Sequence, residues 1–143
     1  MSDLVKQKQI EQANQFNVPL PETCEVLNWQ DKTLFCWVET SKGEIKIWQQ
    51  SIFDYMLSKA SDYGKDILDV PKKLYSAPTL QEILKAIFAY NKHLVIELQP
   101  NYINLGLDKI NINEGKQSIT FSWENENLAE CAAQVYLELI TYT

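Results

Sequence analysis

Side chains that commonly carry out enzymatic chemistry are sparse in this sequence. His93 is the only histidine, so any Ser-His-Asp or Cys-His site has to be built on it. It stands beside Lys92 at the start of an expected strand, where a surface position is the simpler interpretation. One histidine and three separated cysteines also supply too few ligands for a typical zinc site. We therefore expect no catalytic residue, no bound metal and no cofactor.

The three cysteines, Cys24, Cys36 and Cys131, lie far apart in apolar surroundings. Their odd number and wide spacing differ from the cysteine framework of a small secreted domain. We expect three reduced, mostly buried thiols. The first residues contain no apolar signal core, and no apolar run approaches the roughly 20 residues of a membrane span. These features predict a cytoplasmic protein.

Acidic side chains offer another route to chemistry. Asp62, Asp66 and Asp69 are close enough in sequence to suggest a cation site, but their spacing differs from that of an EF-hand, and Lys65 lies among them. A solvated loop of mixed charge is the preferred interpretation. Carboxylates paired for hydrolysis can come from any part of a chain. A small enzyme with a carboxylate or tyrosine site therefore stays as an alternative.

The charge balance argues against nucleic acid as a partner. The chain has 13 basic and 19 acidic side chains and a net charge of −6, and every basic residue is a lysine. Without arginine it lacks the bidentate donor that reads guanine and clamps phosphates. No basic residue follows Lys116, so the C-terminal segment is expected to present an acidic face. That face comprises Glu124, Glu126, Glu130 and Glu138. A second alternative is an acidic DNA mimic that inhibits a DNA-binding protein.

Aromatic residues are the most suggestive group. Four tryptophans and seven tyrosines occur in 143 residues, and both types are common anchors of protein interfaces. Trp29, Trp48 and Tyr63 are the aromatic candidates for an interface, together with the four C-terminal glutamates. The competing interpretation is that the aromatics fill a core between sheet and helices.

An α+β fold has to position these residues. Leu34 to Val38 is apolar at every position, which predicts a strand covered on both faces. Ser118 to Trp123 alternates between polar and apolar residues, which predicts a strand with one wet face. Thr79 and Glu82 form a capping box for a helix with a regular apolar stripe, and Asn127 with Glu130 does so for the last helix. The expected helices are 3–16, 21–29, 79–90 and one after 127; the expected strands are 33–40, 45–48, 93–98, 102–108 and 118–123, with 50–75 a partly helical connection.

Together these elements predict a single globular domain over residues 1–143. The expected order is ααββ(α)αβββα, with an antiparallel sheet of about five strands and helices packed against it.

The segment Ser-Ala-Pro-Thr-Leu-Gln-Glu-Ile-Leu at 76–84 resembles an Ala-Pro-Thr-Leu-x-Glu-Leu-Leu stretch in small uncharacterised phage and prophage proteins. Those proteins also have a proline-started short helix leading into an aromatic strand, like Pro21 to Trp37 here. The family carries no established activity, so the resemblance implies only an origin in a mobile genetic element. We expect an accessory protein that binds another protein, or itself as a homodimer, without a membrane or nucleic-acid partner.

Overall fold

The computed structural model describes the backbone of residues 3–63, 69–90, 94–111 and 115–142, and the side chains of these except 61–63, 107–111, 115–119 and 142. The chain divides into two compact units, Met1–Thr79 (unit 1) and Leu80–Thr143 (unit 2). None of the helices in the described part of the chain has the length and apolarity to cross a bilayer.

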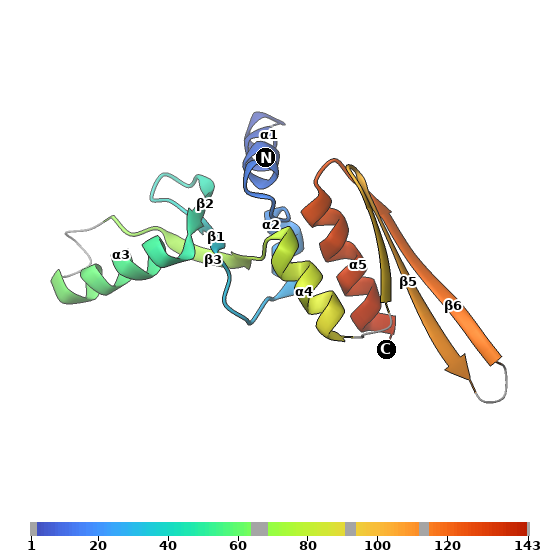
Figure 1. Cartoon of the computed structure of the whole chain (residues 1–143). Helices are drawn as coiled ribbons and strands as arrows, with labels where there is room; N and C mark the ends of the chain where they lie inside the picture. Colours follow the sequence, from blue (N-terminus) through green and yellow to red (C-terminus); the bar gives the residue numbers. More distant parts are fainter. Residues whose placement is uncertain (1–2, 64–68, 91–93, 112–114, 143) are drawn as a thin grey trace. The chain divides into compact units, whose positions relative to one another are not determined.

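Unit 1 is built on a three-stranded antiparallel sheet in the order β2-β1-β3 (Figure 1). A tight hairpin turn joins β1 to β2, in which the Gly43 N–H donates to the Thr40 carbonyl (2.9 Å). Gly43 has a φ of +82° there, which glycine adopts without strain. The elements of unit 1 are α1 (Asp3–Phe16), α2 (Pro21–Leu27), β1 (Phe35–Glu39), β2 (Ile45–Gln49), α3 (Gln50–Tyr63) and β3 (Lys72–Ala77).

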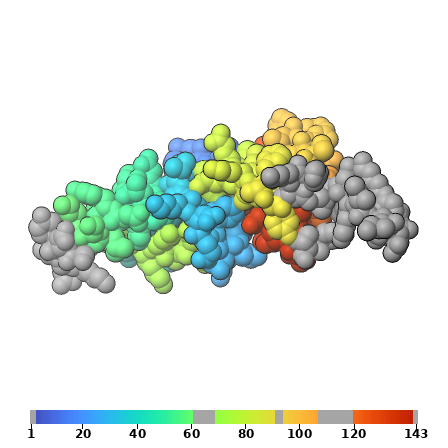
Figure 2. All heavy atoms as spheres, turned by 60° about the horizontal axis from the view of Figure 1, so that its bottom comes forward, coloured from blue at the N-terminus to red at the C-terminus, as the bar shows by residue number. Residues whose placement is uncertain are grey.

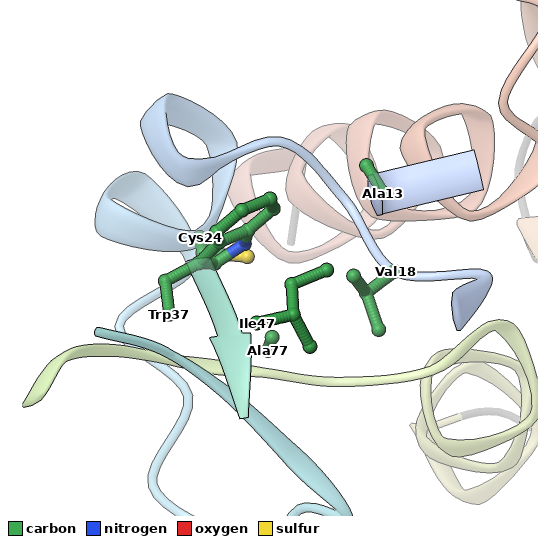
Figure 3. Packing of buried hydrophobic residues seen from close by; sticks show 6 residues of the cluster. All are labelled: Ala13, Val18, Cys24, Trp37, Ile47 and Ala77. Atoms are coloured by element: carbon green, nitrogen blue, oxygen red, sulfur yellow. The ribbon is translucent and has the colours of Figure 1, made fainter. Parts of the chain in front are cut away.

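The central strand β1 is covered on both faces, as its unbroken apolar run predicts. Trp37 points into a cluster whose members come from α1, α2 and all three strands (Figure 3). Cys36 and Val38 point to the opposite face and pack with Phe53 of α3. Because successive side chains of a strand alternate between faces, only an apolar residue at every position can serve two cores.

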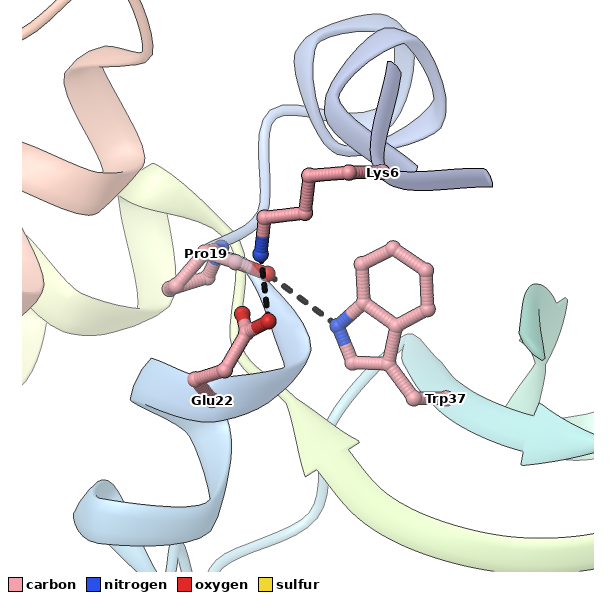
Figure 4. A network of polar contacts seen from close by, with 4 residues as sticks. All are labelled: Lys6, Pro19, Glu22 and Trp37. Carbon is pink, nitrogen blue, oxygen red and sulfur yellow. Dashed lines mark hydrogen bonds and ion pairs between the residues drawn. The ribbon is translucent and has the colours of Figure 1, made fainter. Parts of the chain in front are cut away.

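Trp37 also forms a hydrogen bond with the segment between α1 and α2. Its side chain is fully buried, and its indole N–H donates to the carbonyl of Pro19 (3.1 Å; Figure 4). A buried indole needs such a partner, since an unsatisfied N–H would be costly. On the outside of the same segment, Lys6 of α1 forms an ion pair with Glu22 of α2.

Unit 2 is a second three-stranded antiparallel sheet, in the order β4-β5-β6. Helix α5 packs along β5 and β6, and α4 packs against α5 (Figure 1). Ile103 and Leu105 of β5 are fully buried, whereas Thr120 and Ser122 of β6 are exposed. The sheet therefore has the expected wet face. The elements are α4 (Leu80–Tyr90), β4 (Leu94–Gln99), β5 (Tyr102–Asn111), β6 (Gly115–Glu124) and α5 (Leu128–Tyr142).

The fold class is α+β, but the expectation of one sheet of about five strands is wrong. There are two three-stranded sheets among the described residues, and one strand, β3, lies in the stretch expected to be a partly helical connection. β3 forms by pairing with β1, which places Lys72 opposite Glu39 and Tyr75 opposite Trp37. The residues of β3 show little alternation of polar and apolar side chains, so the sequence of this segment alone does not predict a strand. The single-domain expectation stays a prediction.

Candidate functional site

The structure gives the two expected interface tryptophans partly buried positions. Trp29 is half-buried. Trp48 is half-buried too and packs against the cluster of Cys36, Val38 and Phe53. The side chain of Tyr63 lies outside the described residues, as does His93. Of these candidates, Trp48 alone lines a surface hollow described below.

The C-terminal glutamates do not form one exposed face. Glu124 and Glu126 are exposed, but Glu130 is only 6% exposed, in the first turn of α5. Its backbone N–H donates a hydrogen bond to the Asn127 side-chain oxygen (3.1 Å). This helix turn is buried, so the Glu130 carboxylate does not belong to the exposed surface. Glu138 is half-buried and accepts a hydrogen bond from the indole of Trp123 (2.7 Å). The expected four-residue acidic surface is therefore reduced to two fully exposed carboxylates.

The three cysteines are buried and have free thiols, which confirms their expected burial. Burial raises the pKa of the Cys36 thiol to about 11, with Asp54 acting in the same direction and Lys73 against it. Burial also raises the pKa of Cys131. A thiol must be ionised to act as a nucleophile, so neither cysteine is activated.

Tyr75 of β3 lies beside carboxylates of α2 in unit 1. Burial raises the pKa of Tyr75, and the charge and hydrogen bond of Glu25 raise it further. The phenol therefore holds its proton at neutral pH and cannot serve as a base.

The three aspartates considered as a cation site are only partly described. Asp69 accepts a hydrogen bond from Ser41 (3.0 Å), while the side chains of Asp62 and Asp66 lie outside the described residues. In the described part of the chain, no three His, Cys, Asp or Glu side chains are grouped to hold a metal ion.

A hollow with a basic lining lies between α1 and the β1–β2 hairpin. We call it the basic hollow; its volume is about 480 Å³. Three lysines and one glutamate line it, which gives a formal charge of +2 in a chain whose net charge is −6. Its lining residues are Val5, Lys8 and Gln12 of α1 and Lys42, Gly43, Glu44, Ile45 and Lys46 of the hairpin.

The pKa of Glu44 is lowered by all three lysines of the basic hollow, Lys46 most. A hydrogen bond and the charge of Lys46 lower the pKa of Glu44, and the charges of Lys8 and Lys42 lower it further. Lys46 and Glu44 form an ion pair with an N–O distance of 3.0 Å. Among the described residues, no carboxylate lies within ion-pairing distance of Lys8 or Lys42. Within the described part of the chain, these two lysines therefore have no ion-pair partner.

A second hollow, of about 220 Å³, lies further along the same strand. We call it the apolar hollow; Phe16, Phe35, Ile47, Trp48, Gln49 and Ile52 line it. The Phe16 and Phe35 rings lie 5.1 Å apart at a tilt of 50°, a favourable aromatic pair. Ile52, in the first turn of α3, remains 49% exposed. Figure 2 shows α3 beside the β1–β2 hairpin on one face of unit 1.

Both hollows lie along β2, an edge strand of its sheet, and both include residues of α1. Phe35 of β1 and Ile52 of α3 complete the lining of the apolar hollow. Between the hollows, the side chain of Gln12 accepts a hydrogen bond from the Ile47 backbone N–H (2.9 Å). We call this line of contact the α1–β2 seam; it is the candidate site.

Comparison of the chain with protein-family models, with curated proteins and with solved structures gives no match. The site therefore has to be interpreted from its own geometry. Sequence reasoning missed the basic hollow because Lys8 belongs to a helix with an ordinary polar face, and Lys42 and Lys46 flank an ordinary turn. Only the packing of α1 beside β2 brings them together.

Proposed function

We propose that this protein acts by binding another protein, as a non-catalytic accessory protein of phage or prophage type. The observation that carries the proposal is the apolar hollow with its exposed rim residue Ile52. Aromatic side chains in a concave apolar site are the usual anchors of a protein interface. The resemblance at residues 76–84 supports the phage or prophage assignment.

The chemistry of the described residues supports binding over catalysis. The pKa values of Cys36, Cys131 and Tyr75 are all raised, so none of these groups is an activated nucleophile or base at neutral pH. The DNA-mimic alternative draws less support, because Glu130 is buried and Glu138 is occupied by Trp123.

Affinity capture with matched variants tests the proposal. The tagged chain would be used as bait in an extract of the cell in which its gene occurs, and partners would be identified by mass spectrometry. Ile52→Asp places a charge at the rim of the apolar hollow. Leu57→Asp is the control, because Leu57 has a similar exposure of 48% on the same helix and does not line the hollow.

We expect a partner that is retained by the wild type and by Leu57→Asp, and whose recovery falls about tenfold with Ile52→Asp, because desolvating a charge in an apolar contact is costly. The proposal fails if no protein is retained above a bait-free control. It also fails if both aspartate variants retain the partner equally.

A further inference from the structure

The basic hollow and the apolar hollow lie in succession along β2, and a single segment that passes over the hydrogen bond between Gln12 and Ile47 can reach both. From Glu44 and Ile45 to Trp48 is three to four residues of β2, which corresponds to about 10–13 Å at ~3.3 Å per residue. An extended segment of about four to six residues covers that length. A partner segment that lies along the α1–β2 seam therefore meets lysines at one end and aromatic and aliphatic side chains at the other.

The chemistry of such a segment follows from the two linings. Lys8 and Lys42 have no carboxylate within ion-pairing distance among the described residues, and a negatively charged side chain would satisfy them. Phe16, Trp48 and Ile52 at the apolar hollow suit a leucine, isoleucine or aromatic side chain. The hairpin backbone offers little to this recognition. Its Gly43 and Glu44 N–H groups already donate to the carbonyl and hydroxyl of Thr40.

We propose that the α1–β2 seam binds a short extended protein segment with carboxylates at one end and an apolar anchor at the other. This inference rests on the proposed function and adds the chemistry of the partner. Salt bridges at the basic hollow set the orientation of the segment, and burial of the anchor supplies the affinity. Two separated, chemically different subsites also exclude segments that are acidic throughout or apolar throughout.

Selection from a displayed library of random 12-residue peptides on the intact chain tests the proposal. Selected peptides would be synthesised with a fluorophore, and their dissociation constants measured by fluorescence anisotropy at low and high salt. The basic-hollow variant is Lys8→Glu with Lys42→Glu. Its control is Lys32→Glu with Lys72→Glu, which makes the same change in net charge at exposed lysines that do not line the hollow. Ile52→Asp and Leu57→Asp form the apolar pair, and the unfolding curve of each variant checks its folding.

We expect selected peptides to place Asp or Glu a few residues from Leu, Ile, Phe or Trp. Lys8→Glu with Lys42→Glu should weaken binding at least about tenfold and remove most of its salt dependence, because the attraction between exposed charges is screened by salt. Ile52→Asp should weaken it by a similar factor, and both controls should stay within about twofold of the wild type.

The outcomes separate this inference from the proposed function. Loss of binding with Ile52→Asp but not with Lys8→Glu and Lys42→Glu overturns the acidic end of the segment and leaves protein binding at the apolar hollow intact. If neither Ile52→Asp nor Lys8→Glu with Lys42→Glu weakens binding, or if the selection yields no peptide, the seam is not the binding site. If sedimentation shows that the wild type self-associates and Ile52→Asp is monomeric, a second copy occupies the seam and the peptide proposal is overturned.

Discussion

The three-stranded sheets of the two units are covered by helices in different ways. In unit 1 the central strand β1 lies between two apolar clusters, one on the side of α1 and α2 and one on the side of α3. In unit 2 the sheet packs against α5 on one face and leaves polar side chains such as Ser122 exposed on the other. The tolerance of a strand to substitution therefore depends on how many of its faces are covered. In β1 every central position should be sensitive, and in β5 and β6 every second one.

The largest effect is expected at Trp37 in unit 1. Trp37→Ala should lower the free energy of unfolding by about 3–5 kcal/mol, because it leaves a cavity in a closed core. It also leaves the Pro19 carbonyl without its indole donor. Trp37→Phe keeps most of the apolar volume and should cost less. Urea denaturation followed by circular dichroism measures both. A loss below about 1 kcal/mol for Trp37→Ala would contradict the two-sided core.

The alternation of buried and exposed residues in unit 2 is tested at Ile103 and Thr120. Ile103→Ala removes a fully buried side chain and should cost about 2–5 kcal/mol. Thr120→Ala changes an exposed position and should stay within about 0.5 kcal/mol of the wild type. The same denaturation experiment applies. Equal losses at the two positions would mean that the unit 2 sheet is covered on both faces, as in unit 1.

The start of α5 provides a smaller effect. The Asn127 side chain accepts a hydrogen bond from the Glu130 N–H, which satisfies one of the unpaired donors of the first helical turn. Asn127→Ala should therefore cost about 1 kcal/mol, and Asn127→Asp, which keeps an acceptor, should cost less. An unchanged thermal midpoint for Asn127→Ala would show that the cap contributes nothing.

The smallest effect is expected at the surface pair of Lys6 and Glu22 in unit 1. Partial burial raises the pKa of Glu22, but the hydrogen bond and charge of Lys6 outweigh it, so the pKa lies below its ordinary value of 4.5. The stability from this pair is present above about pH 4.5 and is lost as the pH falls through the lowered pKa. Because the side chains of Lys6 and Glu22 are 36% and 57% exposed, water screens the pair, and Glu22→Gln should cost less than about 1 kcal/mol at pH 7.

The difference between Glu22→Gln and the wild type should close towards pH 3, where the wild-type carboxylate is protonated too. Urea denaturation at pH 7, 5 and 3 provides the measurement. If the difference in free energy of unfolding between the two proteins grew on acidification, the pKa of Glu22 would not be lowered by folding.

Much of the fold could be predicted because its signals are local. Pro21 starts α2, Gly43 turns the β1–β2 hairpin, and Asn127 precedes α5; each residue acts on its immediate neighbours. The capping box at Thr79 stands directly before α4 in the structure, and its contribution to stability stays a prediction. The wet face expected from the alternation in 118–123 is confirmed at Thr120 and Ser122, and the two covered faces expected from the apolar run at 34–38 are confirmed at 36–38. Leu34 and Trp123, at the ends of these patterns, are 65% and 37% exposed.

The strand β3 and the candidate site could not be predicted in this way. Lys72–Ala77 becomes a strand through pairing with residues far away in β1. The exposure of Glu130 was also misjudged, because it was grouped with the other C-terminal glutamates by charge, although Ala129 and Cys131 beside it are buried too.

The α+β class, most helix and strand positions, the burial of the cysteines and the absence of arginine from any site all follow from the order of the amino acids. Those properties depend on composition or on residues within a few positions of one another. Tertiary structure alone decided that there are two sheets, that Trp37 is closed into a core by Pro19, and that Lys8 meets Lys42 beside β2. Such features depend on which distant segments pack together, and the periodicity of a segment indicates its buried face but not the segment that packs against it.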